Sequence, residues 1–242
     1  MSAPPGIDAN GCVLTIANAP IQTQFQPLLA DVCESLAGAG LGLHSLYLYG
    51  SVARGDASPG ESDLDVTLVL TDPPDAHVLE ALEQLRQALE QRHEVVSKID
   101  FDRWGFWLKH HCRCVWGDDL SLRFEPFRPS RDIALALNGD FEPELSGYLT
   151  RIEHASSPPE RLRLQREAAR KLIRATHTLR TADTSGWPQT LEEHVALFVQ
   201  HYPSMRVQIA YFLFEARNPS AECAAFSTRL RAFVSWMVSP QA

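Results

Sequence analysis

Two aspartates, Asp63 and Asp65, stand one residue apart where a polar loop gives way to an apolar segment. In a β-strand, residues two apart project from the same face, about 6.5–7 Å from each other along the chain. Two carboxylates placed in this way repel each other unless a cation lies between them, and hard oxygen ligands at this spacing suit Mg²⁺. The pair therefore predicts a magnesium site.

Gly50 and Ser51 stand before this loop, at the end of another apolar segment. Glycine lets a backbone approach a ligand closely, and the hydroxyl and N–H of Ser51 would lie at a predicted helix start, where anions bind well. Magnesium in proteins commonly takes one or two carboxylates together with substrate phosphates. We therefore expect Gly50 and Ser51 to hold phosphates and the two aspartates to hold the metal.

A third carboxylate is expected if a hydroxyl nucleophile is activated near the metals. In two-metal chemistry one ion steadies the leaving oxygens, and the other lowers the pKa of the attacking oxygen. Asp100 is the preferred candidate, because Ile99 and Phe101 place it within a third strand. Asp102 shares its face and stays the alternative, although it precedes Arg103 and can pair with it.

A lone Asp-x-Asp or a lone Gly-Ser turn has little specificity, and only the combination is informative. Over residues 43–102 the sequence resembles the nucleotidyltransferase superfamily, of the DNA polymerase beta and kanamycin nucleotidyltransferase type. The resemblance depends on Gly-Ser-x-x-x-Gly at residues 50–55 and Ser-Asp-x-Asp at residues 62–65, together with the apolar residues that border them.

The resemblance implies a metal-dependent enzyme that transfers a nucleoside monophosphate, most directly AMP from ATP, to a hydroxyl group. The acceptor would be a small molecule or a protein, and pyrophosphate would be released. ATP or another nucleoside triphosphate is the implied co-substrate, with two Mg²⁺ ions. The implied residues are Asp63, Asp65 and Asp100 for the metal and catalysis, and Gly50, Ser51 and Arg54 for the nucleotide.

A basic helix is predicted over residues 161–180. Its basic side chains recur at three- and four-residue spacing and so line one face; they are Arg163, Arg166, Arg170, Arg174 and His177. One interpretation is a solvated face paired with nearby acids. The other is a clamp that offsets triphosphate charge, with Arg170 and Arg174 as the nucleotide ligands. A helical arginine placed like Arg174 occurs in the enzymes that the sequence resembles.

Other functions stay open. An aminoglycoside-type antibiotic adenylyltransferase usually carries a Ser-Lys shortly after this helix, whereas residues 181–194 read TADTSGWPQTLEEH. A non-catalytic nucleotide-binding or toxin–antitoxin regulatory module is another alternative, but binding alone does not require a third acid that acts as a base. A zinc site at residues 110–114 (HHCRC) lacks the second ligand pair that structural zinc normally uses.

The hydrophobic pattern predicts the elements that must position these residues. Helices are expected at 25–39 and 76–92, and strands at 43–49, at 64–70 and within 93–104. From about residue 127 helices predominate, at 130–154, 160–182, 190–201, 204–217 and 220–238. We therefore expect an α+β fold. A nucleotidyltransferase catalytic domain (1–126), with a small mixed sheet and flanking helices, would precede an all-helical bundle domain (127–242).

Composition narrows the partners and the location. The net charge of −8 argues against broad nucleic-acid binding, which needs a cationic face. No apolar stretch approaches the ~20 residues that span a bilayer, and the first residues lack the features of a signal peptide. Five cysteines without framework spacing suit a reducing compartment. We therefore expect a cytoplasmic protein without a membrane partner.

Overall fold

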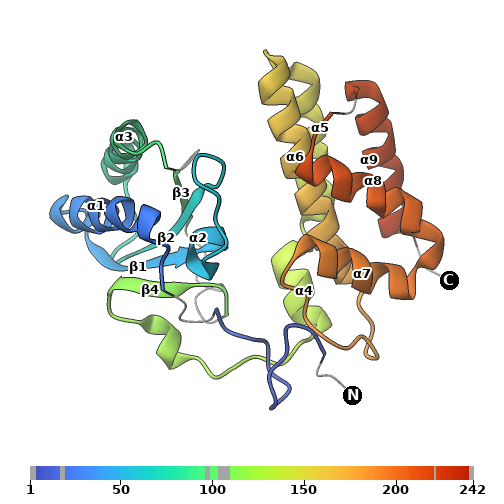
Figure 1. Cartoon of the computed structure of the whole chain (residues 1–242), viewed down its shortest axis with the longest axis horizontal. Coiled ribbons are helices and arrows are strands. Elements are labelled where there is room, and N and C mark those ends of the chain that lie inside the picture. Colours follow the sequence, from blue (N-terminus) through green and yellow to red (C-terminus); the bar gives the residue numbers. More distant parts are fainter. Residues whose placement is uncertain (1–3, 17–19, 96–98, 103–109, 221, 240–242) are drawn as a thin grey trace. The chain divides into compact units, whose positions relative to one another are not determined.

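The computed structural model describes residues 4–16, 20–95, 99–102, 110–220 and 222–239. Internal contacts divide the chain into two compact units, which can be followed in Figure 1. One comprises Val13–Phe127 and is called the sheet unit below. The other comprises Met1–Cys12 and Arg128–Ala242 and is called the helical unit.

A four-stranded mixed sheet forms the centre of the sheet unit as far as its residues are described. The strands lie in the order β3-β2-β1-β4 and are β1 (Leu43–Tyr49), β2 (Leu64–Leu70), β3 (Ile99–Asp102) and β4 (Arg113–Gly117). β1 pairs antiparallel with β2 and β4, whereas β3 runs parallel to β2. The predicted mixed sheet is therefore confirmed. β4 was not predicted, because five residues carry too little alternation to be recognised.

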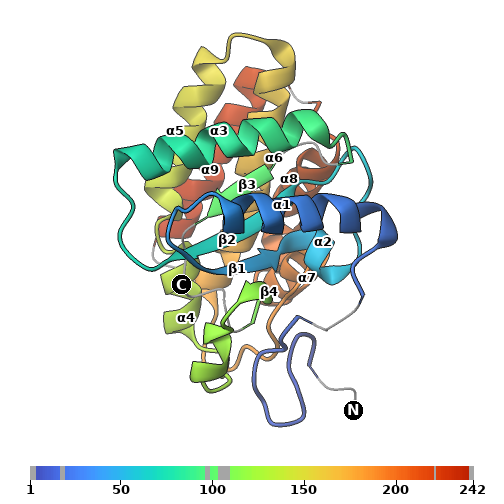
Figure 2. The ribbon, with the colours of Figure 1, turned by 90° about the vertical axis from the view of Figure 1, so that its left-hand side faces the viewer.

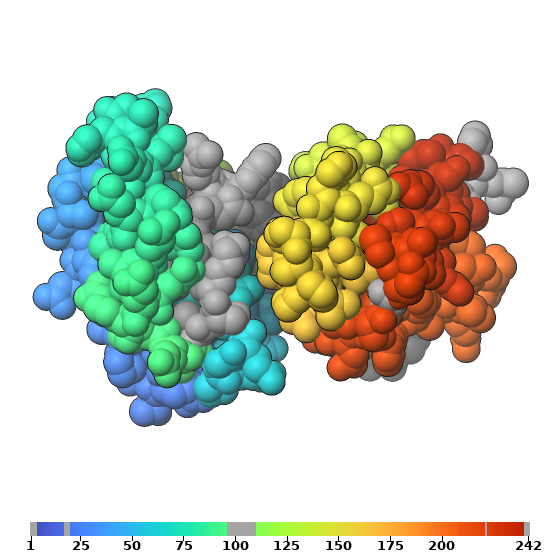
Figure 3. Space-filling model, turned by 90° about the horizontal axis from the view of Figure 1, so that it is seen from above, coloured from blue at the N-terminus to red at the C-terminus, as the bar shows by residue number. Residues whose placement is uncertain are grey.

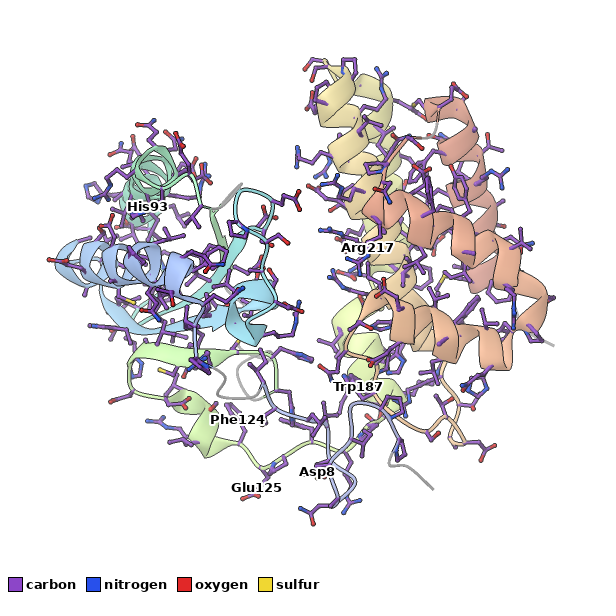
Figure 4. All side chains as sticks on the ribbon, in the orientation of Figure 1. Asp8, His93, Phe124, Glu125, Trp187 and Arg217 are labelled. Carbon is purple, nitrogen blue, oxygen red and sulfur yellow. The ribbon has the colours of Figure 1, made fainter. Side chains whose placement is uncertain are left out.

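Two helices, α1 (Gln26–Gly38) and α3 (Ala76–Arg92), lie side by side on one face of this sheet (Figure 2). Alternation along β1 and β2 turns every second residue toward these helices. The buried residues of this layer include Leu28, Val32, Leu36, Leu46, Leu48, Leu64, Val66 and Leu68. Much of α3 remains on the surface of the unit (Figure 3). Its end is tied to α1 by a 2.8 Å contact between His93 Nε2 and Asp31 Oδ2 (His93 is labelled in Figure 4).

The opposite face of the sheet is more polar. Tyr47 and Thr67 are both buried there and are register partners on β1 and β2. The Tyr47 hydroxyl accepts a 2.6 Å hydrogen bond from the N–H of Leu120, the first residue of the short helix η3 (Leu120–Arg123). This is the face on which Asp65 lies, because Asp65 and Thr67 are two residues apart on β2.

The helical unit is built from amphipathic helices around one apolar core. In chain order its elements are α4 (Arg131–Asn138), α5 (Phe141–His154), α6 (Pro158–Ala175), η4 (Thr176–Leu179), α7 (Leu191–His201), η5 (Pro203–Met205), α8 (Arg206–Arg217) and α9 (Cys223–Val238). The predicted helix over 130–154 is two helices, since the chain turns at Gly139 and Asp140. No described helix combines the length and apolar character that crossing a membrane requires.

The described residues before Val13 pack with the helical unit, whereas a catalytic domain over 1–126 is predicted from the sequence. The N–H of Trp187 donates a 2.8 Å hydrogen bond to the carbonyl of Pro5. Gly6 lies so close that a Cβ on it would overlap the Trp187 carbonyl. An arm with many Pro, Gly and Asn residues carries no hydrophobic period, so its packing partner could not be predicted from its sequence.

Candidate active site

The acidic motif lies at the start of β2, where the chain passes from the loop of residues 56–63 into the sheet. Leu64 and Val66 are fully buried beneath the helices. Asp65 stands between them and therefore projects from the opposite face of the sheet. Asp63 is the residue directly before the strand. Both aspartates are half-buried, so their carboxylates remain within reach of a ligand.

Gly50 and Asp65 lie against each other. β1 and β2 pair so that Tyr49 is opposite Asp65, and the next residue, Gly50, begins the short helix α2 (Gly50–Arg54). Gly50 has φ +70°, and a Cβ built on it would overlap Oδ2 and Cγ of Asp65. The Asp65 carboxylate thus occupies space that exists only because residue 50 has no side chain. The two motifs predicted from the sequence therefore meet in the structure.

This arrangement fits a hard divalent cation. Carboxylate oxygens are the ligands that Mg²⁺ prefers, and it commonly takes one or two of them beside substrate phosphates. Asp63 and Asp65 provide such oxygens next to the backbone of α2. Within the described residues no group of three or more His, Cys, Asp or Glu side chains gathers in a way that could hold a metal. The side chain of Asp100, the predicted third ligand, is outside the described set.

Ser51 and Arg54 belong to α2. The carbonyl of Ser51 accepts a 3.1 Å hydrogen bond from Asp56 N–H, which closes the turn after the helix. Arg54 forms an ion pair with Asp56 at 3.2 Å, and both side chains are largely exposed. An exposed pair of this kind is weak, so it leaves the guanidinium able to exchange partners. Ser51 and Arg54 stay predictions as nucleotide ligands.

The loop between α2 and β2 is held in place by hydrogen bonds that the sequence did not reveal. The Gln22 side-chain amide bonds the N–H and the carbonyl of Ala57, each at 3.2 Å. Ser62 accepts a 2.9 Å hydrogen bond from Ser58 N–H through its hydroxyl. Gln22 lies 35 residues before Ala57, so no local pattern could identify it as a support for this loop.

Asp100 lies on β3, directly beside β2. In the parallel register Asp65 is aligned with Asp100, and Thr67 is aligned with Asp102. The backbone therefore puts Asp100 at the position nearest Asp65 on the neighbouring strand. The register is consistent with the preference for Asp100 over Asp102, and the assignment stays a prediction.

Comparison with known proteins agrees with this geometry. Residues 29–117 match the family model described as a nucleotidyltransferase domain, a range that runs from α1 to the end of β4. Residues 29–117 therefore form a nucleotidyltransferase domain. Both the recognition of the superfamily and the prediction of a transferase enzyme are confirmed.

One solved structure shows how far the fold likeness extends. Spectinomycin adenyltransferase AAD(9) from Enterococcus faecialis, crystallised with ATP and spectinomycin, has a TM-score of 0.55 with this chain at 16% identity. The likeness covers 85% of this chain and 98% of that one, and at this identity it shows the fold alone. No curated protein sequence matches this chain significantly.

The basic face predicted over residues 161–180 is only partly present. α6 ends at Ala175, so His177 lies on η4 and not on the face of the long helix. His177 is buried, and burial, followed by the nearby Arg180 charge, lowers its pKa to about 3. His177 is therefore neutral at ordinary pH, and its assignment to a basic face is wrong. Arg163 pairs with Glu167 on the same helix at 2.6 Å, as a solvated face would.

Arg170 and Arg174 both lie on α6 in the helical unit, where Arg170 is half-buried and Arg174 is exposed. The acidic motif and the Gly-Ser turn belong to the sheet unit. The assignment of these two arginines to the triphosphate stays a prediction.

The segment over residues 110–114 has a structural role. Nε2 of His110 accepts a 3.0 Å hydrogen bond from Phe127 N–H, and the backbone carbonyl of His110 accepts one from Ile16 N–H at 3.1 Å. His110 thus connects the first and the last segments of the sheet unit close to β4. A ring nitrogen that accepts this bond is not available to a zinc ion, which argues against the zinc alternative.

Proposed function

We propose that this enzyme transfers AMP from ATP to a hydroxyl group of a small molecule and releases pyrophosphate. The observation that supports this most is the Asp65 carboxylate seated on Gly50, next to Asp63 and the start of α2. A motif that gathers acids beside an open backbone turn serves phosphoryl chemistry, in which positioning and charge neutralisation supply most of the catalysis.

In this proposal each residue has a separate role. Asp63, Asp65 and Asp100 would hold two Mg²⁺ ions, which neutralise phosphate charge and lower the pKa of a nearby hydroxyl when bound. Gly50 leaves room for the Asp65 carboxylate beside the backbone of α2, where the triphosphate would bind, and Ser51 would donate hydrogen bonds to phosphate oxygens. A carboxylate oxygen of Asp100 accepts the acceptor's hydroxyl proton. The resulting oxygen attacks the α-phosphorus, and the bond between that phosphorus and pyrophosphate breaks.

Among small-molecule acceptors, an aminoglycoside-type antibiotic is the first to test. The similar solved structure contains ATP and spectinomycin, and its fold likeness extends over nearly all of that protein. A net charge of −8 also favours a cationic acceptor over an anionic one. The missing Ser-Lys after α6 argues for a changed binding mode or a different member of this acceptor class.

The proposal is tested by incubating the full chain with ATP labelled at the α-phosphate, Mg²⁺ and a panel of hydroxyl-bearing acceptors. The panel should contain aminoglycosides, spectinomycin, lincosamides, tRNA and co-encoded proteins. We expect labelled acceptor and pyrophosphate in equal amounts, and loss of both in EDTA. Label on tRNA or on a protein alone would contradict the small-molecule assignment.

The Asp63→Asn/Asp65→Asn double variant should lose at least ~10³-fold in rate, because both metal-binding carboxylates become neutral. Asp72→Asn is the matched control, since Asp72 is exposed beyond the far end of β2. Mg²⁺-dependent pyrophosphate release that persisted in the double variant would falsify the mechanism.

A further inference from the structure

A small cavity in the helical unit, partly open to the surface, is lined by residues that have no part in the proposed reaction. Its volume is about 20 Å³, and a water molecule needs roughly 10–15 Å³ on this measure. It therefore has room for one water-sized or monatomic group. Polar side chains from the segment after α6 and from α7 line part of it, including Thr176, His177, Arg180, Thr184, His194 and His201, and the rest of the lining is largely apolar, with Leu179, Leu197, Phe198 and Tyr202.

Arg180 places a positive charge beside this cavity. The residue is only 8% exposed. One of its terminal nitrogens bonds Nε2 of His177 at 3.1 Å, and the other donates to the carbonyl of Thr184 at 2.9 Å. Both partners are neutral, and no acidic side chain among the described residues forms an ion pair with Arg180. A guanidinium stays charged at neutral pH, so this is a buried cation without a carboxylate.

The neighbouring groups stabilise this cation but do not neutralise it. Nε2 of His177 accepts the hydrogen bond from Arg180, so the ring carries its proton on Nδ1 and is uncharged. The Trp187 ring lies 5.4 Å from the guanidinium carbon, and its π-electrons attract the charge (Trp187 is labelled in Figure 4). A guanidinium has five N–H donors, and the two bonds above use two of them. The remaining donors suit an anion.

We propose that the cavity binds one chloride-sized monovalent anion, which supplies the counter-charge of the Arg180 guanidinium. The anion would stabilise the loop between η4 and α7, because this loop carries both Thr184 and Trp187. The site is independent of the acceptor and of the transfer reaction.

Thermal unfolding of the full chain tests the site. Sodium chloride is titrated against sodium gluconate at constant ionic strength, because gluconate is too large for the cavity. We expect Tm to rise with the logarithm of chloride concentration above the Kd, by about 4 °C at ten times the Kd. Equal Tm values in the two salts would overturn the proposal.

Two variants and a crystal complete the test. Arg180→Met should abolish the chloride dependence, whereas Arg163→Met, which removes an exposed ion pair with Glu167, should keep it. A chloride dependence that survived in folded Arg180→Met would also overturn the site. If Arg180→Met does not fold, crystals of the unmodified protein grown in bromide decide the question. An anomalous peak beside Arg180 supports the proposal, and its absence contradicts it.

Discussion

The two units hold charge in opposite ways. In the sheet unit, Asp63 and Asp65 are half-buried at a strand start, where a ligand can reach them. In the helical unit, Arg180 is buried among neutral partners. A gathering of accessible carboxylates suits a metal and its substrate, whereas a buried cation suits a small permanent counter-ion. This difference in exposure, as much as the difference in charge, is why we propose a catalytic role for the two aspartates and a structural role for Arg180.

The largest effect is expected from a substitution that disturbs the contact between Gly50 and Asp65. Gly50→Ala would place a methyl group on the Asp65 carboxylate and force an L-residue to adopt φ +70°. We expect AMP transfer to fall by about 10³-fold, because displacement of a metal ligand disrupts charge stabilisation in the transition state. Steady-state pyrophosphate release measures this.

Gly40→Ala separates backbone strain from the overlap with Asp65. Gly40 has φ +66°, and nothing lies within 4 Å of a Cβ placed on it. It should lose stability as Gly50→Ala does through strain, but keep its activity. Equal losses of activity in the two variants would show that the contact with Asp65 has no catalytic role.

The third carboxylate is the next test. Asp100→Asn should lower kcat by about 10²–10³-fold, since its register position is beside Asp65 and the variant cannot accept a proton. Asp102→Asn, aligned with Thr67, should lower kcat no more than about threefold. The reverse order of the two effects would assign the third acid to Asp102. The pH dependence of kcat distinguishes a lost base from a lost metal ligand.

Acid should lower the stability of the fold through His177, which is buried in the helical unit. The pKa of His177 is about 3 in the folded chain, below its ordinary value of 6.5. Between these values the unfolded chain binds more protons, so stability falls as the pH drops from 6.5 toward 3 and is constant above 6.5. From pH 6.5 to pH 5 this amounts to about 2 kcal/mol in the free energy of unfolding.

His177→Gln should remove most of this slope, because an amide oxygen can accept the Arg180 bond but does not titrate in this range. Urea unfolding at a series of pH values measures it. His154→Gln is the matched control, since His154 is exposed at the end of α5. An unchanged slope in His177→Gln would assign the acid sensitivity to other groups.

The smallest effect is expected on α6. Arg174→Ala should raise KM for ATP by about tenfold with little change in kcat, if its charge serves ground-state binding of the triphosphate. Arg163→Ala should leave KM within about twofold, because Arg163 pairs with Glu167. Equal KM values in the two variants would contradict a role for Arg174 in ATP binding and would favour the interpretation of α6 as a solvated face.

Sequence reasoning succeeded where the signal was local. The bounds of β1, β2 and α3 agree with the prediction, since alternation and helical spacing are read within a few residues. The prediction was wrong for His177, because the predicted α-helix continued past Ala175, where the chain forms the 3₁₀-helix η4. Gln22 and the first twelve residues were missed because their partners are distant in the sequence.

The amino-acid sequence by itself predicted the type of chemistry, because Gly-Ser and Asp-x-Asp at this spacing are residue types that suit phosphates and a divalent metal. Only the tertiary structure decided that Gly50 and Asp65 touch, since that contact follows from the pairing of β1 with β2. Only the tertiary structure revealed the buried Arg180 as well. From sequence alone an arginine is expected to be exposed at the surface. Its burial depends on packing between elements that are distant along the chain.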